Sequence, residues 1–504
     1  MFERCLALAA ILLLTGCSAT PPSPQTVTMV IESSPTSLDP RIGVDSQSEH
    51  ITSLIFDSLV HKNAHFNLDP WLATSWETPD PLTYRFHLRT DVHFHNGKPL
   101  TATDVKYTLD SMRNGTVITA KAGALARIDH VDAPDAATIV IHLKQPDAAL
   151  LWNLSDGAIG IVPAGSGSDF AFHPIGSGPF RFVSQLQDDE VIIERNDHSW
   201  QPRPAIARIR FAVVPDAITR ALELEKGSAD VCINCLTADM VSALAKRPNL
   251  QVESGPGTNL NYISFNTQDS VLRDLHVRQA IAYAMNRPLI ISSLWRGRAQ
   301  LADSLLPPQH WAFNANVEQH GSDPAGANAL LDQAGYRRGR DGIRFHIAEK
   351  ISDNDTVRLV AAAMQQQLAQ VGIAVDLRSF EFATFYSDLV RGAFQIAPSR
   401  WIGGNENPDI YRYAYASTSI PPHGSNRGYY SNPEVDRLIA DATATFNREH
   451  QRDDYARIQQ ILAHDLPTIN LWYLNAVVVH DRRLSNIHPN PSGTFDFLRT
   501  ATLQ

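Results

Sequence analysis

Two cysteines in the body of the chain stand three residues apart, in the string C-I-N-C at Cys232 and Cys235. This spacing suits a local disulfide, a thiol–disulfide redox pair, or half of a zinc site. A zinc site would need a second pair of ligands, and no second C-x-x-C string exists. Because the start of the chain indicates export, as described below, we expect a local disulfide or two inert thiols.

A group of histidines lies between residues 60 and 100, at His61, His65, His87, His93 and His95. Zinc-binding histidines on a helix commonly stand four residues apart on one face. These five fall in predicted strands and turns, without such a helical pair. We therefore interpret them as surface or edge histidines, and we expect neither a metal site nor a cofactor.

The segment at residues 400–409 combines groups that can bind small molecules. It reads R-W-I-G-G-N-E-N-P-D and supplies a guanidinium, an indole, two glycines, an amide and a carboxyl group, at Arg400, Trp401, Gly403, Gly404, Asn405 and Glu406. The glycines permit backbone angles that other residues rarely adopt. This composition is typical of an ordered loop.

Strings of common enzyme classes are absent. The sequence contains neither G-x-S-x-G, nor H-E-x-x-H, nor G-x-x-x-x-G-K-[ST], and no paired carboxyl groups stand out. Catalytic groups can be scattered along a chain, so an enzyme stays an alternative. Binding without turnover is the favoured interpretation.

The first 26 residues resemble an export signal followed by a tether. An apolar run at residues 6–14 follows Arg4, and it is shorter than the roughly 20 residues of a membrane span. The string L-T-G-C at residues 14–17 resembles the bacterial lipobox, whose cysteine carries lipid. We expect a signal peptide at residues 1–16, lipidation of Cys17 and a flexible tether at residues 17–26. An ordinary cleaved signal is the alternative.

Length and charge limit the class of protein. A chain of 504 residues exceeds one ordinary hydrophobic core, so two or three domains are expected. The formal net charge is −10 and no long run of charge occurs, which argues against nucleic acid as a partner.

The most distinctive local pattern precedes residue 105. Apolar and polar residues alternate at residues 84–89 and predict a half-buried strand, and a second short apolar run at residues 92–94 predicts another strand. N-G at residues 96–97 favours a tight turn. Thr101 can then cap a helix, with Asp104 at the third position of a capping box.

Two strand–helix–strand units indicate a parallel sheet. In the first, a strand at residues 206–214 precedes a helix capped by Asp216 and ended by Gly227, and another strand follows. In the second, a helix at residues 357–368 joins strands at residues 343–347 and 373–377. Such crossovers connect parallel strands, which predicts an α/β fold.

Several strings, in order along the chain, resemble one family. They are V-x-F-H-N-G-K-P-L-T-A-x-D-V at residues 92–105, P-I-G-S-G-P-F at 174–180, V-R-Q-A-I-A-Y-A-M-N-R at 277–287, and Y-S-N-P-E-V-D at 430–436. Together they are similar to the family 5 extracellular solute-binding proteins, which deliver dipeptides, oligopeptides or nickel to ABC importers. The resemblance covers nearly all of residues 27–504.

The resemblance implies a type II periplasmic-binding-protein fold, with two lobes around a ligand cleft and an extra subdomain inserted in the first lobe. Lobe I would comprise residues 27–57, 178–265 and 478–504. The inserted subdomain would comprise residues 58–177, and lobe II residues 266–477.

The resemblance also implies where ligand binds. The loop at residues 400–409 would lie in the cleft, where we expect Trp401 to pack against the ligand and its neighbours to orient it. Asp45, Ser46 and Gln47 are further candidate cleft residues, although they could equally begin a helix. In peptide-binding relatives an aspartate three residues after the tryptophan pairs with the α-ammonium group of the peptide, and here that position is Gly404.

The implied function is capture of a peptide or similar small solute and its delivery to an ABC permease with its ATPase, by a monomeric protein held on a membrane through lipid, on the periplasmic side in a Gram-negative cell. The altered position at Gly404 leaves a nickel chelate, a sugar or another non-peptide solute as alternatives. For a nickel ligand His423 is a candidate, although we interpret it as an exposed histidine of a loop rich in proline and glycine. A ligand sensor with the same fold is a further alternative.

Overall fold

The computed structural model describes residues 26–155 and 159–504. The expected signal peptide, the lipidation site at Cys17 and the tether up to residue 25 lie outside the described residues. Residue 26, the last of the expected tether, already belongs to the first strand. Within the described ranges, no helix combines the length and hydrophobicity that a membrane crossing requires.

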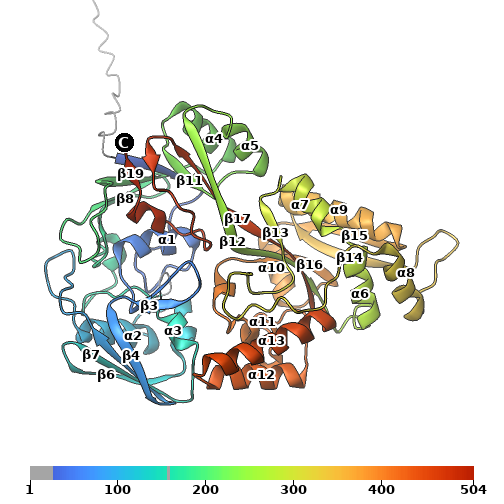
Figure 1. The fold of residues 1–504 in the computed structure, drawn as a ribbon, viewed down its shortest axis with the longest axis horizontal. Coiled ribbons are helices and arrows are strands. Elements are labelled where there is room, and N and C mark those ends of the chain that lie inside the picture. The colour runs from blue at the N-terminus through green and yellow to red at the C-terminus, as the bar shows by residue number, and fades with distance from the viewer. Residues whose placement is uncertain (1–25, 156–158) are drawn as a thin grey trace, which may run out of the picture.

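One large mixed sheet runs through both halves of the molecule (Figure 1). Its strand order is β15-β14-β16-β12-β17-β11-β1-β10-β9-β8, and β13 pairs with β17 beside this path. The strands are β1 (Thr26–Ile31), β8 (Phe180–Leu186), β9 (Glu190–Arg195), β10 (Arg208–Val213), β11 (Val231–Ile233), β12 (Leu250–Phe265), β13 (Ala299–Leu301), β14 (Phe345–Ser352), β15 (Ile373–Phe380), β16 (Ile396–Trp401) and β17 (Thr468–Asp481).

The first half of this sheet contains the first predicted crossover. Strands β10 and β11 both pair in parallel with β1, which lies between them. Helix α4 (Ala217–Lys226) joins them, with Asp216 accepting a hydrogen bond from the amide of Thr219 and Gly227 in the left-handed conformation at φ 77°. The predicted parallel arrangement is confirmed, together with both ends of its helix. Helices α1 (Ser46–Ile55) and α5 (Ala238–Leu244) complete this half.

A separate four-stranded antiparallel sheet falls within residues 58–177. Its order is β4-β5-β7-β6, and helix α2 packs against it. The backbone N–H of Thr101 donates to the Asp104 carboxylate at 2.8 Å, so the predicted capping box is present. The elements of this subdomain are β2 (Val60–Lys62), β3 (Leu68–Pro70), β4 (Ala73–Asp80), β5 (Thr83–Leu88), β6 (Ile128–Asp135), β7 (Thr138–Leu143), α2 (Ala102–Arg113) and α3 (Leu150–Asn153).

The prediction of a second strand at residues 92–94 is wrong. Only one isolated bridge forms there, between His93 and Pro99. The tight turn at Gly97, with φ 81°, leaves too few residues for a ladder, and proline lacks the N–H that a ladder needs. Val92 and Phe94 are nevertheless buried, as their apolar character predicts.

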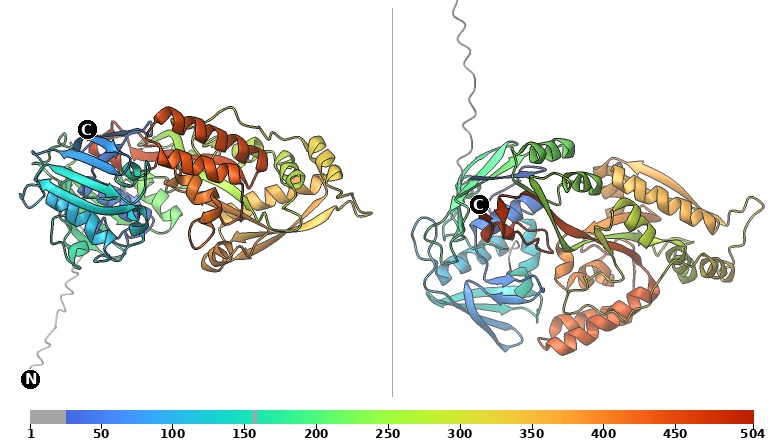
Figure 2. Two further views of the ribbon diagram at one scale, coloured as in Figure 1. Left: turned by 90° about the horizontal axis from the view of Figure 1, so that it is seen from below. Right: turned by 45° about the horizontal axis from the view of Figure 1, so that its top comes forward.

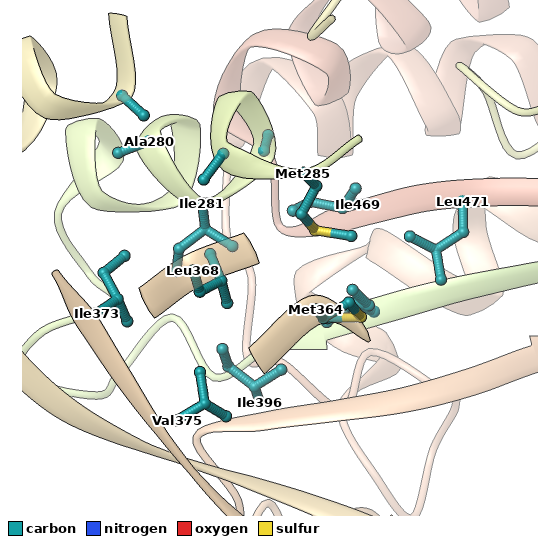
Figure 3. Packing of buried hydrophobic residues seen from close by; sticks show 14 of the residues in the cluster. Ala280, Ile281, Met285, Met364, Leu368, Ile373, Val375, Ile396, Ile469 and Leu471 are labelled. Atoms are coloured by element: carbon teal, nitrogen blue, oxygen red, sulfur yellow. The ribbon is translucent and has the colours of Figure 1, made fainter. Parts of the chain in front are cut away.

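The second half contains the other predicted crossover. Strands β14 and β15 pair in parallel along their full length, and helix α9 (Asp355–Gln370) connects them. Figure 3 shows the core under this unit, where side chains of β15 and α9 meet those of helix α6 and strand β17. The remaining helices of this half are α6 (Leu275–Ala284), α7 (Arg287–Leu294), α8 (Pro324–Gln333), α10 (Phe382–Val390), α11 (Ile410–Tyr415), α12 (Pro433–Ala444) and α13 (Arg448–Asp465).

Two long strands connect the halves. Strands β12 and β17 pair antiparallel from Leu250 to Ser264, with irregularities in register between Gly255 and Asn259 and between Asn261 and Tyr262. Figure 1 shows them side by side at the centre of the molecule. After β17 the chain forms the short strands β18 (Leu484–Ser485) and β19 (Thr502–Leu503), and its apolar residues join the core around β1.

Candidate functional site

Strand β16 presents the first residues of the 400–409 segment to opposite sides of the sheet. Arg400 and Ile402 line a cleft between the lobes. The ring of Trp401 points to the other side, where it stacks on Tyr262 at 5.8 Å between ring centroids and contacts Tyr413 at 6.2 Å. The two directions follow from the alternation of side chains along a strand. Because β16 extends to Trp401, the predicted loop begins only after this residue.

The turn after β16 is held from within the protein. Gly403 adopts φ 72° and begins a 3-10 turn at Gly404–Glu406. The side-chain amide of Asn405 donates to the carbonyl oxygens of Thr258 and Leu305, at 2.9 and 3.0 Å. Asn405 is fully buried, so its amide anchors this turn to β12.

Glu406 joins three parts of the molecule. Its carboxylate accepts a hydrogen bond from the Thr258 hydroxyl at 2.8 Å and forms an ion pair with Lys62 of the inserted subdomain. Its backbone carbonyl lies 3.0 Å from Nε2 of His310. Burial lowers the pKa of His310 to about 3, so the ring is neutral at neutral pH and Nε2–H donates. Glu406 is itself only 2% exposed.

The residues at the start of α1 have separate tasks. Asp45 accepts hydrogen bonds from the amides of Ser48 and Thr36, at 2.9 and 3.2 Å, and so caps the helix. Burial acts to raise the pKa of Asp45, but these hydrogen bonds outweigh it and lower the pKa. The next two residues, Ser46 and Gln47, line the interlobe cleft.

The cleft has an empty volume of about 1310 Å³, which includes some open solvent, and both halves of the molecule contribute to its walls. The first half contributes the ends of β1 and β11 and the start of α1. The second half contributes β16 and the segment before β13, and the crossing strands form the floor. Polar lining residues are Glu32, Ser46, Gln47, His50, Asn234, Asn259, Arg298, Arg400, Asn475 and Ser492.

Charges in the cleft are divided between the two halves. Glu32 follows β1, whereas Arg298 and Arg400 come from the second half. Arg298 donates to the Ser242 hydroxyl at 3.0 Å, and Arg400 is exposed without an ion-pair partner among the described residues. Burial lowers the pKa of His50 to about 4, so this ring is neutral at neutral pH. The cleft lining therefore carries two guanidinium groups from the second half and one carboxylate from the first half.

Several buried polar atoms of the cleft have no hydrogen-bond partner within the described part of the chain. They are Oε1 of Gln47, Oδ1 of Asn259, Nε1 of Trp295, Oδ1 of Asn475 and Oγ of Ser492. Leaving a buried polar atom unpaired costs about 1–3 kcal/mol. These atoms can instead bond a polar ligand or ordered water.

The structure thus brings Ser46, Gln47 and Arg400 together in one cleft. Asp45, Asn405 and Glu406 are engaged in contacts within the protein, and Trp401 packs on the other side of β16. The backbone of Gly403 and Gly404 forms the turn beside the cleft. The roles of all nine residues in ligand binding stay predictions.

Sequence reasoning missed half of the cleft. Glu32 and Asn234 directly follow parallel strands, and the carboxyl ends of such strands commonly line a ligand site, so this signal was available. Arg298 and Trp295 carry no comparable signal, because they follow α7 and reach the cleft through the packing of that helix against β13 and β17.

The two cysteines also reach the cleft. Cys232 and Cys235 form a disulfide with a Cα–Cα separation of 6.2 Å, and both line the cleft wall. A disulfide was one of the expected states. Asn234 between them adopts φ 52° and exchanges backbone and side-chain hydrogen bonds with Val477 of β17.

Two α/β lobes joined by paired strands around a polar cleft define a two-lobed solute-binding protein. Comparison with known proteins agrees. The model of the bacterial extracellular solute-binding proteins, family 5, matches residues 67–421, more than half of the chain. The chain belongs to this family. The family and the two-lobed fold inferred from the sequence are confirmed, and the family comprises binding proteins.

Relatives along almost the whole chain include a di/tripeptide-binding protein of Pseudomonas aeruginosa, 29% identical over 82% of this chain and 83% of the relative. The glutathione-binding protein GsiB of Pectobacterium atrosepticum is 30% identical over 92% and 91%. The periplasmic binding protein DppA of Helicobacter pylori, solved with the peptide STSA, is 26% identical with a TM-score of 0.78, covering 95% and 98%.

Proposed function

We propose that this protein is the substrate-binding component of an ABC importer and that it binds a short peptide in the interlobe cleft. The observation that carries the proposal is the polar cleft itself, in which charges of both signs and unpartnered polar atoms face a shared space. Relatives that bind dipeptides, tripeptides and glutathione support the same class of ligand.

The division of charge suggests how a peptide would lie. The α-carboxylate would pair with Arg400 and Arg298, since guanidinium groups form paired hydrogen bonds with carboxylates. The α-ammonium group would approach Glu32 on the opposite lobe. This arrangement would replace the aspartate that the sequence lacks at Gly404.

We further propose that lobe I comprises residues 27–57, 178–265 and 478–504, that residues 58–177 form the insertion, and that residues 266–477 form lobe II. The protein would act as a monomer, tethered to a membrane through lipid on Cys17, and would deliver its ligand to a permease driven by an ATPase. A ligand that touches both lobes would favour their closed arrangement, because it binds that arrangement more tightly.

The test is isothermal titration calorimetry with trialanine, its C-terminally amidated form and its N-acetylated form. Replacing Arg400→Ala should weaken trialanine binding about tenfold to a hundredfold, the value of one hydrogen bond to a charged group. The amidated peptide should lose little further affinity in this variant. Arg340→Ala, which removes an exposed arginine outside the cleft lining, is the matched control.

Binding of trialanine with the same affinity in the Arg400→Ala and unmodified proteins would contradict the proposed orientation. If no peptide binds, native mass spectrometry of the purified protein should reveal a non-peptide ligand, and the peptide proposal would fail. Intact recovery of trialanine after incubation is expected of a binding protein, whereas turnover would indicate an enzyme.

A further inference from the structure

A histidine pair lies on the outer face of the inserted subdomain. His130 of β6 and His142 of β7 are direct partners in the antiparallel ladder, and their rings stack at 4.2 Å between centroids with an angle of 12°. Asp132 stands two residues after His130 on the same face of β6. None of the three lines the interlobe cleft.

Three ligand atoms converge at this place. Oδ2 of Asp132 lies 3.5 Å from Nε2 of His142 and 3.7 Å from Nε2 of His130. In a tetrahedral zinc site the bonds are about 2.0–2.1 Å, which places neighbouring ligand atoms about 3.4 Å apart. The two measured separations therefore suit an ion held between the three side chains.

A fourth residue orients the first histidine. Oδ2 of Asp129 lies 2.8 Å from Nδ1 of His130, so Asp129 accepts the Nδ1–H, and in the neutral ring the lone pair is then on Nε2. Nε2 of His130 lies 3.7 Å from the Asp132 carboxylate, and two acceptors this close repel each other unless a cation lies between them. Metal-binding histidines commonly have such a carboxylate behind the ring.

The cation could be a proton or a metal ion. A proton would give a surface ion pair between one histidine and Asp132, with no need for the second ring. The convergence of a second imidazole favours a metal ion, because both rings can turn about their soft χ2 torsions toward one centre. Imidazole and carboxylate together suit zinc, nickel or copper better than magnesium or calcium.

We propose that His130, Asp132 and His142 bind a divalent transition-metal ion on the surface of the inserted subdomain, with Asp129 as a positioning residue. His130 and Asp132 are exposed and His142 is half-buried, so an ion can enter from solvent and keep water at its open position. Bound metal would link β6 to β7 across the edge of their sheet.

Calorimetric titration of the metal-free full chain with zinc chloride tests the proposal. We expect one site whose affinity falls at least about tenfold in both His142→Ala and Asp132→Asn, because each variant removes one of three ligands. His87→Ala is the matched control, since His87 is exposed on the same face of the same sheet, on the neighbouring strand β5. It should bind zinc as tightly as the unmodified protein.

A second measurement separates metal binding from folding. Without metal, the His142→Ala protein should unfold at about the same temperature as the unmodified protein. Excess zinc should raise the unfolding temperature of the unmodified protein and of His87→Ala only, since a ligand stabilises the state that binds it. Asp129→Ala should weaken zinc about tenfold while leaving one site, as expected of an orienting carboxylate. Equal zinc affinity in His142→Ala and the unmodified protein would overturn the proposal.

Discussion

Glu349 of β14 is a carboxyl group buried in the second lobe. It is 1% exposed, and neither of its oxygens has a hydrogen-bond partner within the described ranges. Burial raises the pKa of Glu349 from 4.5 to about 8, because the charged form loses its hydration. At neutral pH this side chain is therefore protonated in the folded protein and ionised in the unfolded chain.

This residue gives stability a defined dependence on pH. Between about pH 4.5 and pH 8 the folded state binds one proton more than the unfolded state, so the contribution of Glu349 to the free energy of unfolding falls as pH rises. Glu349→Gln removes this contribution. The free energy of unfolding of the variant minus that of the unmodified protein should be larger at pH 8 than at pH 5, by a few kcal/mol.

Urea unfolding at both pH values measures the effect. Comparison within each pH cancels the opposite contributions of the neutral buried histidines, such as His50 and His310. Glu77→Gln, at an exposed position, should show no change between the two pH values. An identical pH dependence in Glu349→Gln and the unmodified protein would show that Glu349 is ionised when folded.

Single residues also show where sequence reasoning ends. Asp104, Asp216 and Gly227 were predicted in their helix-end roles because those roles depend on immediate neighbours. His130 and His142 are twelve residues apart and meet only through the register of a hairpin, so their proximity could not be read from spacing. Arg298 reaches the cleft through tertiary packing alone.

Among elements, helix α1 depends on close contact with the segment that leads into β8. A Cβ atom added at Gly176 would lie 1.9 Å from the carbonyl oxygen of Ile55, at the end of α1. The same segment is tied to His95, whose Nδ1 accepts from the amide of Gly176 and whose Nε2 lies 3.1 Å from the Gly178 carbonyl oxygen. His95 is therefore a structural residue at this junction.

Gly176→Ala should destabilise the protein by about 1–3 kcal/mol or more, because backbone must move to admit the methyl group. The midpoint of urea unfolding reports the change. Gly321→Ala is the control, since a Cβ there meets nothing within 4 Å. If both variants unfold at the same urea concentration, α1 and this segment can move apart to admit the methyl group with little loss of stability, which would contradict the prediction.

The elements themselves were largely predictable. The helices and strands of both crossovers, like the other long capped helices and alternating strands, carry local patterns: apolar residues recur every three to four residues in a helix and every two residues in a strand. The pairing order of the large sheet carries no such pattern, since β12 and β17 join segments more than 200 residues apart. Resemblance to a family, rather than periodicity, supplied the two-lobed arrangement.

At the scale of the whole molecule, the inserted subdomain contacts the second lobe directly, at residues outside the lining of the interlobe cleft. The Lys62–Glu406 ion pair is joined by a hydrogen bond from Arg448 to Asn67 at 2.9 Å and by another from the Ala148 amide to the Thr443 carbonyl at 3.1 Å. Both views of Figure 2 place this subdomain beside helices α12 and α13. These contacts hold the lobes together.

Lys62→Met should shift the protein toward a more open arrangement. It leaves the Glu406 carboxylate without its cation in a site that is only 3% exposed, and opening relieves that cost. Small-angle scattering of the ligand-free protein should show a larger radius of gyration, and ligand affinity should fall with the fraction of closed protein.

The double variant Lys62→Met with Glu406→Gln should return toward the original radius, because no buried charge then remains unpaired. Arg85→Met, which breaks an exposed pair within the subdomain, should leave the radius unchanged. A radius of gyration that Lys62→Met leaves unaltered would mean that the other contacts suffice to keep the lobes together.

The paired strands β12 and β17 restrict how the lobes can move. A two-stranded ribbon can flex across its face while its hydrogen bonds persist, but sliding or splaying its strands would break them. The register irregularities at Gly255–Asn259 and Asn261–Tyr262 interrupt the hydrogen-bonded ladder, and we expect the ribbon to flex there. We therefore expect the two lobes to move as rigid bodies about a single hinge axis. One angle should describe this motion, and distances between probes placed on the two lobes should change together.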